Sequence, residues 1–183
     1  VARSPISLEL LYRMVQELSD NKMNTLFIHL NDNEIIAEAA YDGTLKGARN
    51  LYSAFRLESE FCRDGQIITS EDLYYTKDEF LQFVKDAANM GVSVVPEIDT
   101  PAHSLFLTKL YPELGFKSGV ELADELDLSN KDVLPTVLAI WEEYLKADED
   151  NIATQPAFSE CDALHIGLDE YYGADGGYVS YIQ

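Results

Sequence analysis

Two adjacent carboxylates, Asp169 and Glu170, directly follow a short apolar run in the segment ALHIGLDEYYG at residues 163–173. Neighbouring acids repel each other, which favours the protonated form of one of them unless another group uses their charge. A carboxyl group held in this way can donate a proton and later accept one, so the pair is a candidate for general acid–base chemistry. The same pairing also occurs at 71–72, 78–79, 124–125 and 142–143. Taken alone, an acid pair is therefore also typical of a solvated surface.

All three histidines of the chain lie in or just after segments with strand character. His29 comes shortly before Asp32, His103 comes shortly after Asp99, and His165 lies inside the segment that ends on the acid pair. In a parallel α/β barrel the loops that follow the strands all open at one rim, where the active site lies. We therefore expect the polar residues after these segments to meet at one end of the sheet.

Helix and strand patterns alternate along the chain. Apolar residues have helical spacing at 7–22, 77–90 and 133–146. Strand character lies at 25–30, 92–99 and 163–168. Ser7 and Thr76 are the expected N-caps of the first two helices, and Gly91 is the expected C-terminal glycine of the second. The alternation predicts right-handed βαβ units, and so an α/β fold with parallel strands.

Composition excludes several classes of partner. The 183 residues include 13 Lys and Arg against 33 Asp and Glu, which gives a net charge of −20. This charge repels phosphate, so we expect no nucleic-acid partner and no anionic membrane surface. No apolar run has the length of a membrane span, so no membrane insertion is expected. Cys62 and Cys161 lack the spacing of a zinc signature, and we expect free thiols, with one disulfide as the alternative.

The ends of the sequence indicate a piece of a longer protein. The chain begins with Val1 rather than Met, and its first residues pass directly into a helical pattern. At 176–183 a new apolar segment is only starting. We therefore expect residues 1–183 to be a single fragment.

Three segments occur in an order and separation that resemble a known enzyme family. They are MNTLFIHLNDNE at 23–34, VPEIDTPAHS at 95–104 and LHIGLDEYYG at 164–173. Together they resemble the catalytic domain of glycoside hydrolase family 20, the β-N-acetylhexosaminidases and lacto-N-biosidases. The likeness runs from Arg3 to about Tyr172. A fourth segment, YSAFRLESE at 52–60, is similar to the branch found in bacterial cell-surface proteins.

The resemblance implies a fold and a reaction. The family folds as a (β/α)₈ TIM barrel, so residues 1–183 would be a fragment of the catalytic barrel with about its first four βα units. Catalysis in the family is retaining and substrate-assisted, because the substrate's own 2-acetamido group is the nucleophile. The implied substrates are glycans with terminal β-GlcNAc or β-GalNAc. No cofactor and no metal is implied, and the family is often secreted or attached to the cell surface.

The resemblance also implies roles for single residues. Glu170 would be the general acid and then the base, while Asp169 would orient the acetamide and stabilise the oxazolinium-like intermediate. Arg3 matches an arginine that binds ring hydroxyls of the terminal sugar. Asp32 and His103 match a polar relay beside the general acid. The remaining matches, which are supporting positions behind the site, are Glu97 and Asp99.

Two alternatives from other functional classes remain open. A metal-dependent barrel hydrolase would use imidazole and carboxylate ligands, and the pairs at hand are His29 with Asp32, Asp99 with His103, and His165 with Asp169. No short His-x-His spacing occurs, and we interpret His165 as structural. The other alternative is a non-catalytic sugar-binding relative, against which the intact acid pair favours an enzyme. Within the family, the sequence leaves hexosaminidase and lacto-N-biosidase both open.

Overall fold

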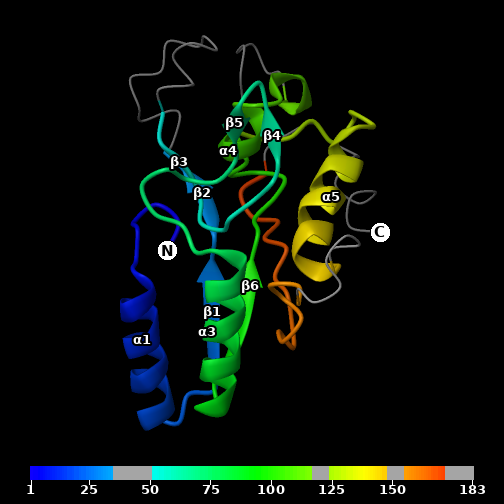
Figure 1. Ribbon diagram of the computed structural model, residues 1–183. Coiled ribbons are helices and arrows are strands. Elements are labelled where there is room, and N and C mark those ends of the chain that lie inside the picture. The colour runs from blue at the N-terminus through cyan, green and yellow to red at the C-terminus, as the bar shows by residue number, and fades with distance from the viewer. Residues whose placement is uncertain (35–50, 117–123, 148–154, 172–183) are drawn as a thin grey trace.

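The structure is a computed structural model, and it describes residues 1–34, 51–116, 124–147 and 155–171 (Figure 1). Its helices are α1 (Leu8–Asp20), α3 (Lys77–Asn89), α4 (Leu105–Thr108) and α5 (Val133–Leu145), with the 3₁₀ helix η1 (Pro112–Leu114). Its strands are β1 (Thr25–His29), β2 (Asn31–Asn33), β3 (Ser53–Phe55), β4 (Cys62–Arg63), β5 (Gln66–Ile67) and β6 (Ser93–Glu97). Among the described residues, no helix is both long enough and apolar enough to cross a membrane.

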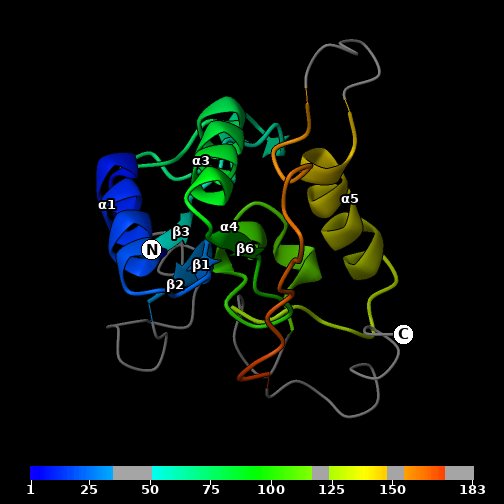
Figure 2. The same cartoon turned by 90° about the horizontal axis from the view of Figure 1, so that it is seen from below.

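A parallel pair of strands, β1 and β6, forms the centre of the fold. The register runs from Thr25 opposite Ser93 to His29 opposite Glu97, so both strands end at the same level. Helix α3 lies between them in the chain, and it packs with α1 on one side of the pair, while α5 lies beyond the β6 edge (Figure 2). The predicted α/β class and the parallel pairing are therefore confirmed.

The two faces of β1 differ in their surroundings because alternate side chains of a strand point to opposite sides. Leu26 and Ile28 are buried in the hydrophobic core, together with apolar residues of α1 and α3. Phe27 points the other way and is 63% exposed. His29, the last residue of the strand, lies on this second face and is only partly buried. The face of β1 that points away from the helices therefore carries a polar residue, His29, at the end of the strand.

Local sequence explains where the helices begin. Ser7 accepts a hydrogen bond from the backbone N–H of Leu10, which satisfies one of the free donors at the start of α1. Thr76 and Glu79 form a reciprocal capping box at the start of α3. Gly91 follows α3 with a φ of 78°, a left-handed conformation that favours glycine. All three predicted boundary residues are confirmed.

The prediction of a strand over 163–168 is wrong. His165 makes a single parallel bridge with Glu97, and no strand forms in this described segment. The reason is the backbone that follows, because Gly167, Leu168 and Glu170 have φ values of 72°, 85° and 52°. Left-handed residues turn the chain away from an extended path. The segment therefore runs parallel to β6 for one residue and then turns over the end of the strand.

Two short antiparallel ladders, which the sequence did not reveal, complete the described fold. β2 pairs with β3 in the register Asn31–Phe55, Asp32–Ala54 and Asn33–Ser53. β4 pairs with β5 as a small hairpin. The segment YSAFRLESE at 52–60 therefore contributes β3, which lies directly against the residues that follow β1. Cys62 and Cys161 are free thiols, as expected.

Candidate active site

Polar residues gather at the end of the central strands, where β1 continues into β2 and β6 continues into a loop. All three residues of β2 are buried although all three are polar. The loop after β6 carries Asp99, which is fully buried, and His103. The segment after His165 brings the acid pair over the same end. The prediction that these residues meet at one rim is confirmed.

Asn31 holds the loop after β6 in place. Its side-chain amide donates to the carbonyl oxygens of Asp99 and His103 at 2.8 and 3.2 Å, and its side-chain oxygen accepts from the Asp99 N–H at 2.7 Å. These three bonds fix the backbone on both sides of the turn, and His103 itself has a left-handed φ of 52°. Sequence analysis missed this role. Its only sequence signal was a polar residue directly after a buried strand.

Asp32 is the centre of a charged network. Its Oδ1 lies 3.0 Å from both Arg3 Nη2 and His103 Nδ1, and its Oδ2 lies 3.1 Å from His29 Nε2. Burial raises the pKa of Asp32, but the hydrogen bonds from His103 and His29 outweigh burial and leave the pKa well below its usual range. Asp32 is therefore an anion that orients three cationic or imidazole side chains.

His103 connects Asp32 to the acid pair. Its Nε2 lies 3.2 Å from Glu170 Oε2, so the imidazole stands between two carboxylates. The Asp32 carboxylate at 3.0 Å, together with the nearby charge of Asp99, raises the pKa of His103 to about 9 although burial opposes the shift. His103 is therefore an imidazolium at neutral pH. The side chain of Glu170 is 63% exposed, which leaves it accessible to a ligand.

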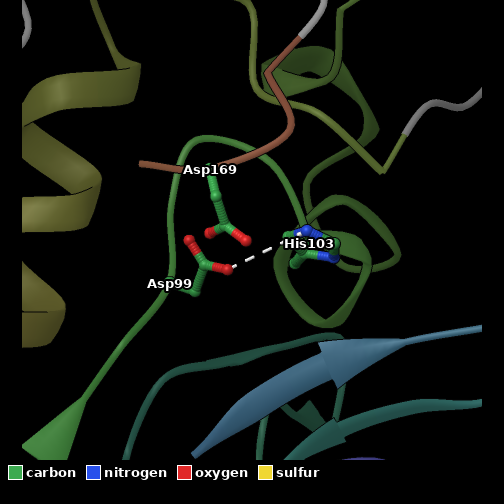
Figure 3. Close-up of side chains that lie close together, drawn as sticks. All are labelled: Asp99, His103 and Asp169. Atoms are coloured by element: carbon green, nitrogen blue, oxygen red, sulfur yellow. Dashed lines mark ion pairs between the residues drawn. The ribbon is translucent and has the colours of Figure 1, made fainter. Parts of the chain in front are cut away.

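Asp99 and Asp169 face each other beside His103 (Figure 3). Asp99 Oδ2 lies 4.0 Å from His103 Nε2, and its Oδ1 accepts from the Leu168 N–H at 3.2 Å. Burial and the adjacent Asp169 carboxylate raise the pKa of Asp99 to about 7. At and below neutral pH, Asp99 therefore carries a proton for a substantial part of the time. A neutral Asp99 can donate that proton to a hydrogen bond with the Asp169 carboxylate.

Gly167 allows this approach of the two segments. Its φ is 72°, and a Cβ atom added there would overlap Asp99 Oδ1 and lie 2.7 Å from Asp99 Cα. Only a residue without a side chain fits so close to the Asp99 backbone. The glycine that precedes the acid pair in the sequence is thus a packing requirement of the site.

The carboxylate of Glu97 contacts the imidazole rings of two histidines. Its Oε2 lies 2.5 Å from His29 Nδ1, and its Oε1 lies 2.7 Å from His165 Nδ1. His29 therefore bridges Glu97 and Asp32, and these two hydrogen bonds raise its pKa although burial opposes the shift. Sequence analysis gave His29 no role outside the metal alternative. Its position three residues before Asp32 was the available signal.

Arg3 lies at the open edge of the network. Its Nε donates to the Asn33 carbonyl at 2.9 Å, while Nη2 pairs with Asp32. Its side chain is 47% exposed, so part of the guanidinium faces solvent. The structure thus brings all seven predicted site residues into one region. These residues are Arg3, Asp32, Glu97, Asp99, His103, Asp169 and Glu170.

One group in the described part of the chain has the spacing of a metal site. Ligand atoms of Asp99, His103 and Asp169 all lie within 4.8 Å of one another. However, both ring nitrogens of His103 already lie beside carboxylate oxygens, Nδ1 at 3.0 Å from Asp32 Oδ1 and Nε2 at 3.2 Å from Glu170 Oε2. A metal ion would have to displace one of them. The arrangement therefore fits proton transfer better than metal ligation.

Comparison with known proteins gives one family. Residues 1–175 match the catalytic domain of glycosyl hydrolase family 20. A lacto-N-biosidase from Bifidobacterium bifidum is 35% identical over 100 residues, which cover 54% of this chain and 8% of that protein. A β-hexosaminidase from Vibrio furnissii is 28% identical over 178 residues, which cover 94% of this chain and 28% of that protein. The chain thus spans less than a third of the length of these curated relatives.

Solved structures show the same fold. The family 20 β-N-acetylhexosaminidase from Streptomyces coelicolor A3(2) superimposes with a TM-score of 0.66 at 19% identity. The match covers 100% of this chain and 34% of that chain. At this identity the likeness is evidence for the fold alone.

Proposed function

The chain belongs to glycosyl hydrolase family 20, an enzymatic family, and from this premise we propose that it is part of an enzyme that removes terminal β-linked N-acetylhexosamine from glycans. Residues 1–183 would form a single fragment of a (β/α)₈ catalytic barrel with about its first four βα units. The parallel β1–β6 pair and the coverage of about a third of a solved relative support this placement. The fragment alone would be inactive, because the remaining strands of the barrel would supply the rest of the sugar pocket.

One observation carries the proposal, which is the position of His103 between Asp32 and Glu170. In the first step, Glu170 would protonate the departing glycosidic oxygen and become a carboxylate. The imidazolium of His103, at 3.2 Å, would stabilise that new negative charge. The anion of Asp32 in turn holds His103 in its charged form. An exposed acid with a cationic partner behind it is suited to this exchange of a proton.

Asp169 would act on the substrate's acetamido group. The acetamide oxygen would attack the anomeric carbon as the glycosidic bond breaks, and Asp169 would accept a hydrogen bond from the acetamide N–H. Its negative charge would balance the positive charge of the cyclic intermediate. Asp99 supports this role, because its neutral carboxyl can donate a hydrogen bond that fixes Asp169. In the second step, Glu170 would take a proton from water, which opens the intermediate with retention.

Arg3 would bind the sugar ring from the side of the network. A guanidinium presents several N–H donors in a fixed plane, which suits vicinal hydroxyl groups. The contacts to Asn33 and Asp32 use two of its nitrogens and leave nearly half of the side chain exposed. These contacts explain how a flexible side chain is kept beside the catalytic groups.

A lacto-N-biosidase is the second candidate within the family. A relative that is 35% identical over 100 residues carries that name. Such an enzyme would release a disaccharide that ends in N-acetylhexosamine, through the same acid pair. The choice between the two depends on the space beyond the first sugar.

The test is an assay of a protein that contains this chain within a complete barrel. We expect hydrolysis of chromogenic β-GlcNAc, β-GalNAc or lacto-N-bioside substrates, with loss of activity toward natural glycans in the Glu170→Gln variant. Activity should persist after treatment with a chelator, since both nitrogens of His103 have carboxylate partners. Binding of these sugars without turnover would favour a non-catalytic relative. Loss of activity that zinc or another divalent ion restores would favour a metal-dependent hydrolase.

A further inference from the structure

Arg56 is a fully buried arginine in the segment YSAFRLESE, to which the proposed reaction gives no role. Its Nε and Nη2 both donate to the carbonyl oxygen of Ala2, at 3.0 and 2.6 Å. Its Nη1 donates to Asp72 Oδ1 at 2.5 Å and to the Leu73 carbonyl at 2.8 Å, and Nη2 also contacts the hydroxyl of Tyr52. A charged side chain is costly to bury unless such contacts satisfy it.

The contact with Ala2 has a geometric meaning. The Ala2 carbonyl belongs to the peptide group that joins Ala2 to Arg3. Two N–H groups of one rigid guanidinium fork converge on that oxygen, which restricts both the position and the tilt of the peptide plane. A single flexible donor such as lysine restrains a carbonyl much less. Arg56 therefore fixes the backbone from which the Arg3 side chain starts.

The same short stretch also fixes the partner of Arg3. β3 pairs with β2 so that Ala54 lies opposite Asp32, and the Arg56 N–H donates to the Leu30 carbonyl at 2.9 Å. Residues 54–56 thus position the backbone of Asp32 through the β2–β3 pairing. They position the backbone of Arg3 through the hydrogen bonds from Arg56 to the Ala2 carbonyl. The 3.0 Å ion pair between Arg3 and Asp32 depends on both attachments.

We propose that Arg56 is a positioning residue that presents the Arg3 guanidinium to the terminal sugar. The inference rests on the proposed function, in which Arg3 binds ring hydroxyls. Arg56 itself is 0% exposed and acts through the Ala2 carbonyl rather than through contact with substrate. The segment YSAFRLESE at 52–60 thus has a role in this proposal, because it positions the residues that would bind the sugar.

The experiment compares kinetics in a protein that contains this chain within a complete barrel. Arg56→Lys keeps the charge but loses the fork, and we expect it to raise KM about tenfold with little change in kcat, because a charge-assisted contact to the sugar is weakened. In an Arg3→Ala background, the same Arg56→Lys change should alter KM less than about twofold, since the two residues act in series. Multiplication of the two single effects would overturn the proposal.

Asp72→Asn separates positioning from stability. It removes the ion pair on the side of Arg56 that faces away from Ala2, so we expect a lower Tm and an unchanged KM. If KM rises in Asp72→Asn in proportion to the loss of Tm, Arg56 has only a structural role. If the wild type hydrolyses no family substrate, the proposed function fails, and a crystal structure of Arg56→Lys then decides the inference. An Arg3–Asp32 pair still at 3.0 Å would overturn it, and a displaced Arg3 would support it.

Discussion

His103 and Glu170 contact each other at 3.2 Å, and both have a left-handed backbone with a φ of 52°. For a residue with a side chain this conformation costs about 1–2 kcal/mol, so the surroundings must enforce it. The amide of Asn31, which donates to the His103 carbonyl, is one such restraint. The pairing of the imidazole with the exposed acid is therefore set by backbone conformation as well as by charge.

His103 should make stability depend on pH. Its pKa is raised from 6.5 to about 9, so its stabilising contribution is complete below pH 6.5 and is lost as the pH rises through 9. We expect the free energy of unfolding to fall across this window and the His103→Gln variant to lack that fall. Urea denaturation at several pH values measures both. Asp99, raised from 3.8 to about 7, acts at lower pH, so an equal fall in the variant above pH 7 would contradict the assignment.

In a protein that contains this chain within a complete barrel, Glu170→Gln should slow hydrolysis to an extent that depends on the leaving group of the substrate. Natural glycosides leave as poor alkoxides and need the proton, whereas activated aryl glycosides need little assistance. We expect a decrease in kcat of at least about 100-fold on natural glycans and a much smaller decrease on nitrophenyl glycosides. Steady-state kinetics on a series of aryl glycosides gives the dependence on leaving-group pKa. Equal losses across the series would argue that Glu170 is not the acid.

Asp169→Asn should slow hydrolysis of both kinds of substrate. The change removes the charge that balances the cyclic intermediate, an electrostatic contribution on the order of 3 kcal/mol. A thiazoline mimic of that intermediate should therefore bind the wild type tightly and lose affinity for the variant, which inhibition constants measure. Equal inhibition of both proteins, or rescue by azide that traps a sugar on a protein carboxylate, would show that the acetamido group is not the nucleophile.

Gly167→Ala should damage the site far more than Gly91→Ala. Both glycines have positive φ, 72° and 78°, so both substitutions carry backbone strain of about 1 kcal/mol. At Gly91 nothing lies within 4 Å of the added methyl group, whereas at Gly167 the methyl group meets Asp99. Thermal unfolding and kcat report the two effects. We expect a modest loss of Tm with normal kcat in Gly91→Ala, and a severe loss of kcat in Gly167→Ala.

If the two variants lose activity to the same extent, the close approach at Gly167 has no part in catalysis. A Gly167→Ala protein that keeps full activity would show that the segment before Asp169 can shift without cost.

The sequence predicted those features that depend on local pattern. Helical spacing and capping residues located α1 and α3, and the order of strands and helices predicted the parallel pair. Polar residues after strand-like segments predicted that the acids and His103 would meet, because parallel strands end at one rim. The family resemblance suggested roles for these residues, which spacing alone could not do.

The missed features depend on contacts between distant residues. Gly167 and Leu168 leave the extended conformation where the chain passes over Asp99, about 70 residues earlier, so the apolar run at 163–168 could not reveal it. Asn31 and Arg56 are polar residues whose roles depend on backbone carbonyls 68 and 54 positions away. No periodicity in the sequence encodes such partners.

The single bridge at His165 has a consequence for local opening. His165 makes two backbone hydrogen bonds across it: its N–H donates to the Pro96 carbonyl, and its carbonyl accepts from the Ile98 N–H. By contrast, β1 and β6 share a five-residue register. Segments with few backbone bonds open at a lower free energy than the core. Amide hydrogens after His165 should therefore exchange well before those of β1 and β6. In a protein that contains this chain within a complete barrel, hydrolysis should then cease at a denaturant concentration at which β1 and β6 are still folded, because the acid pair detaches first.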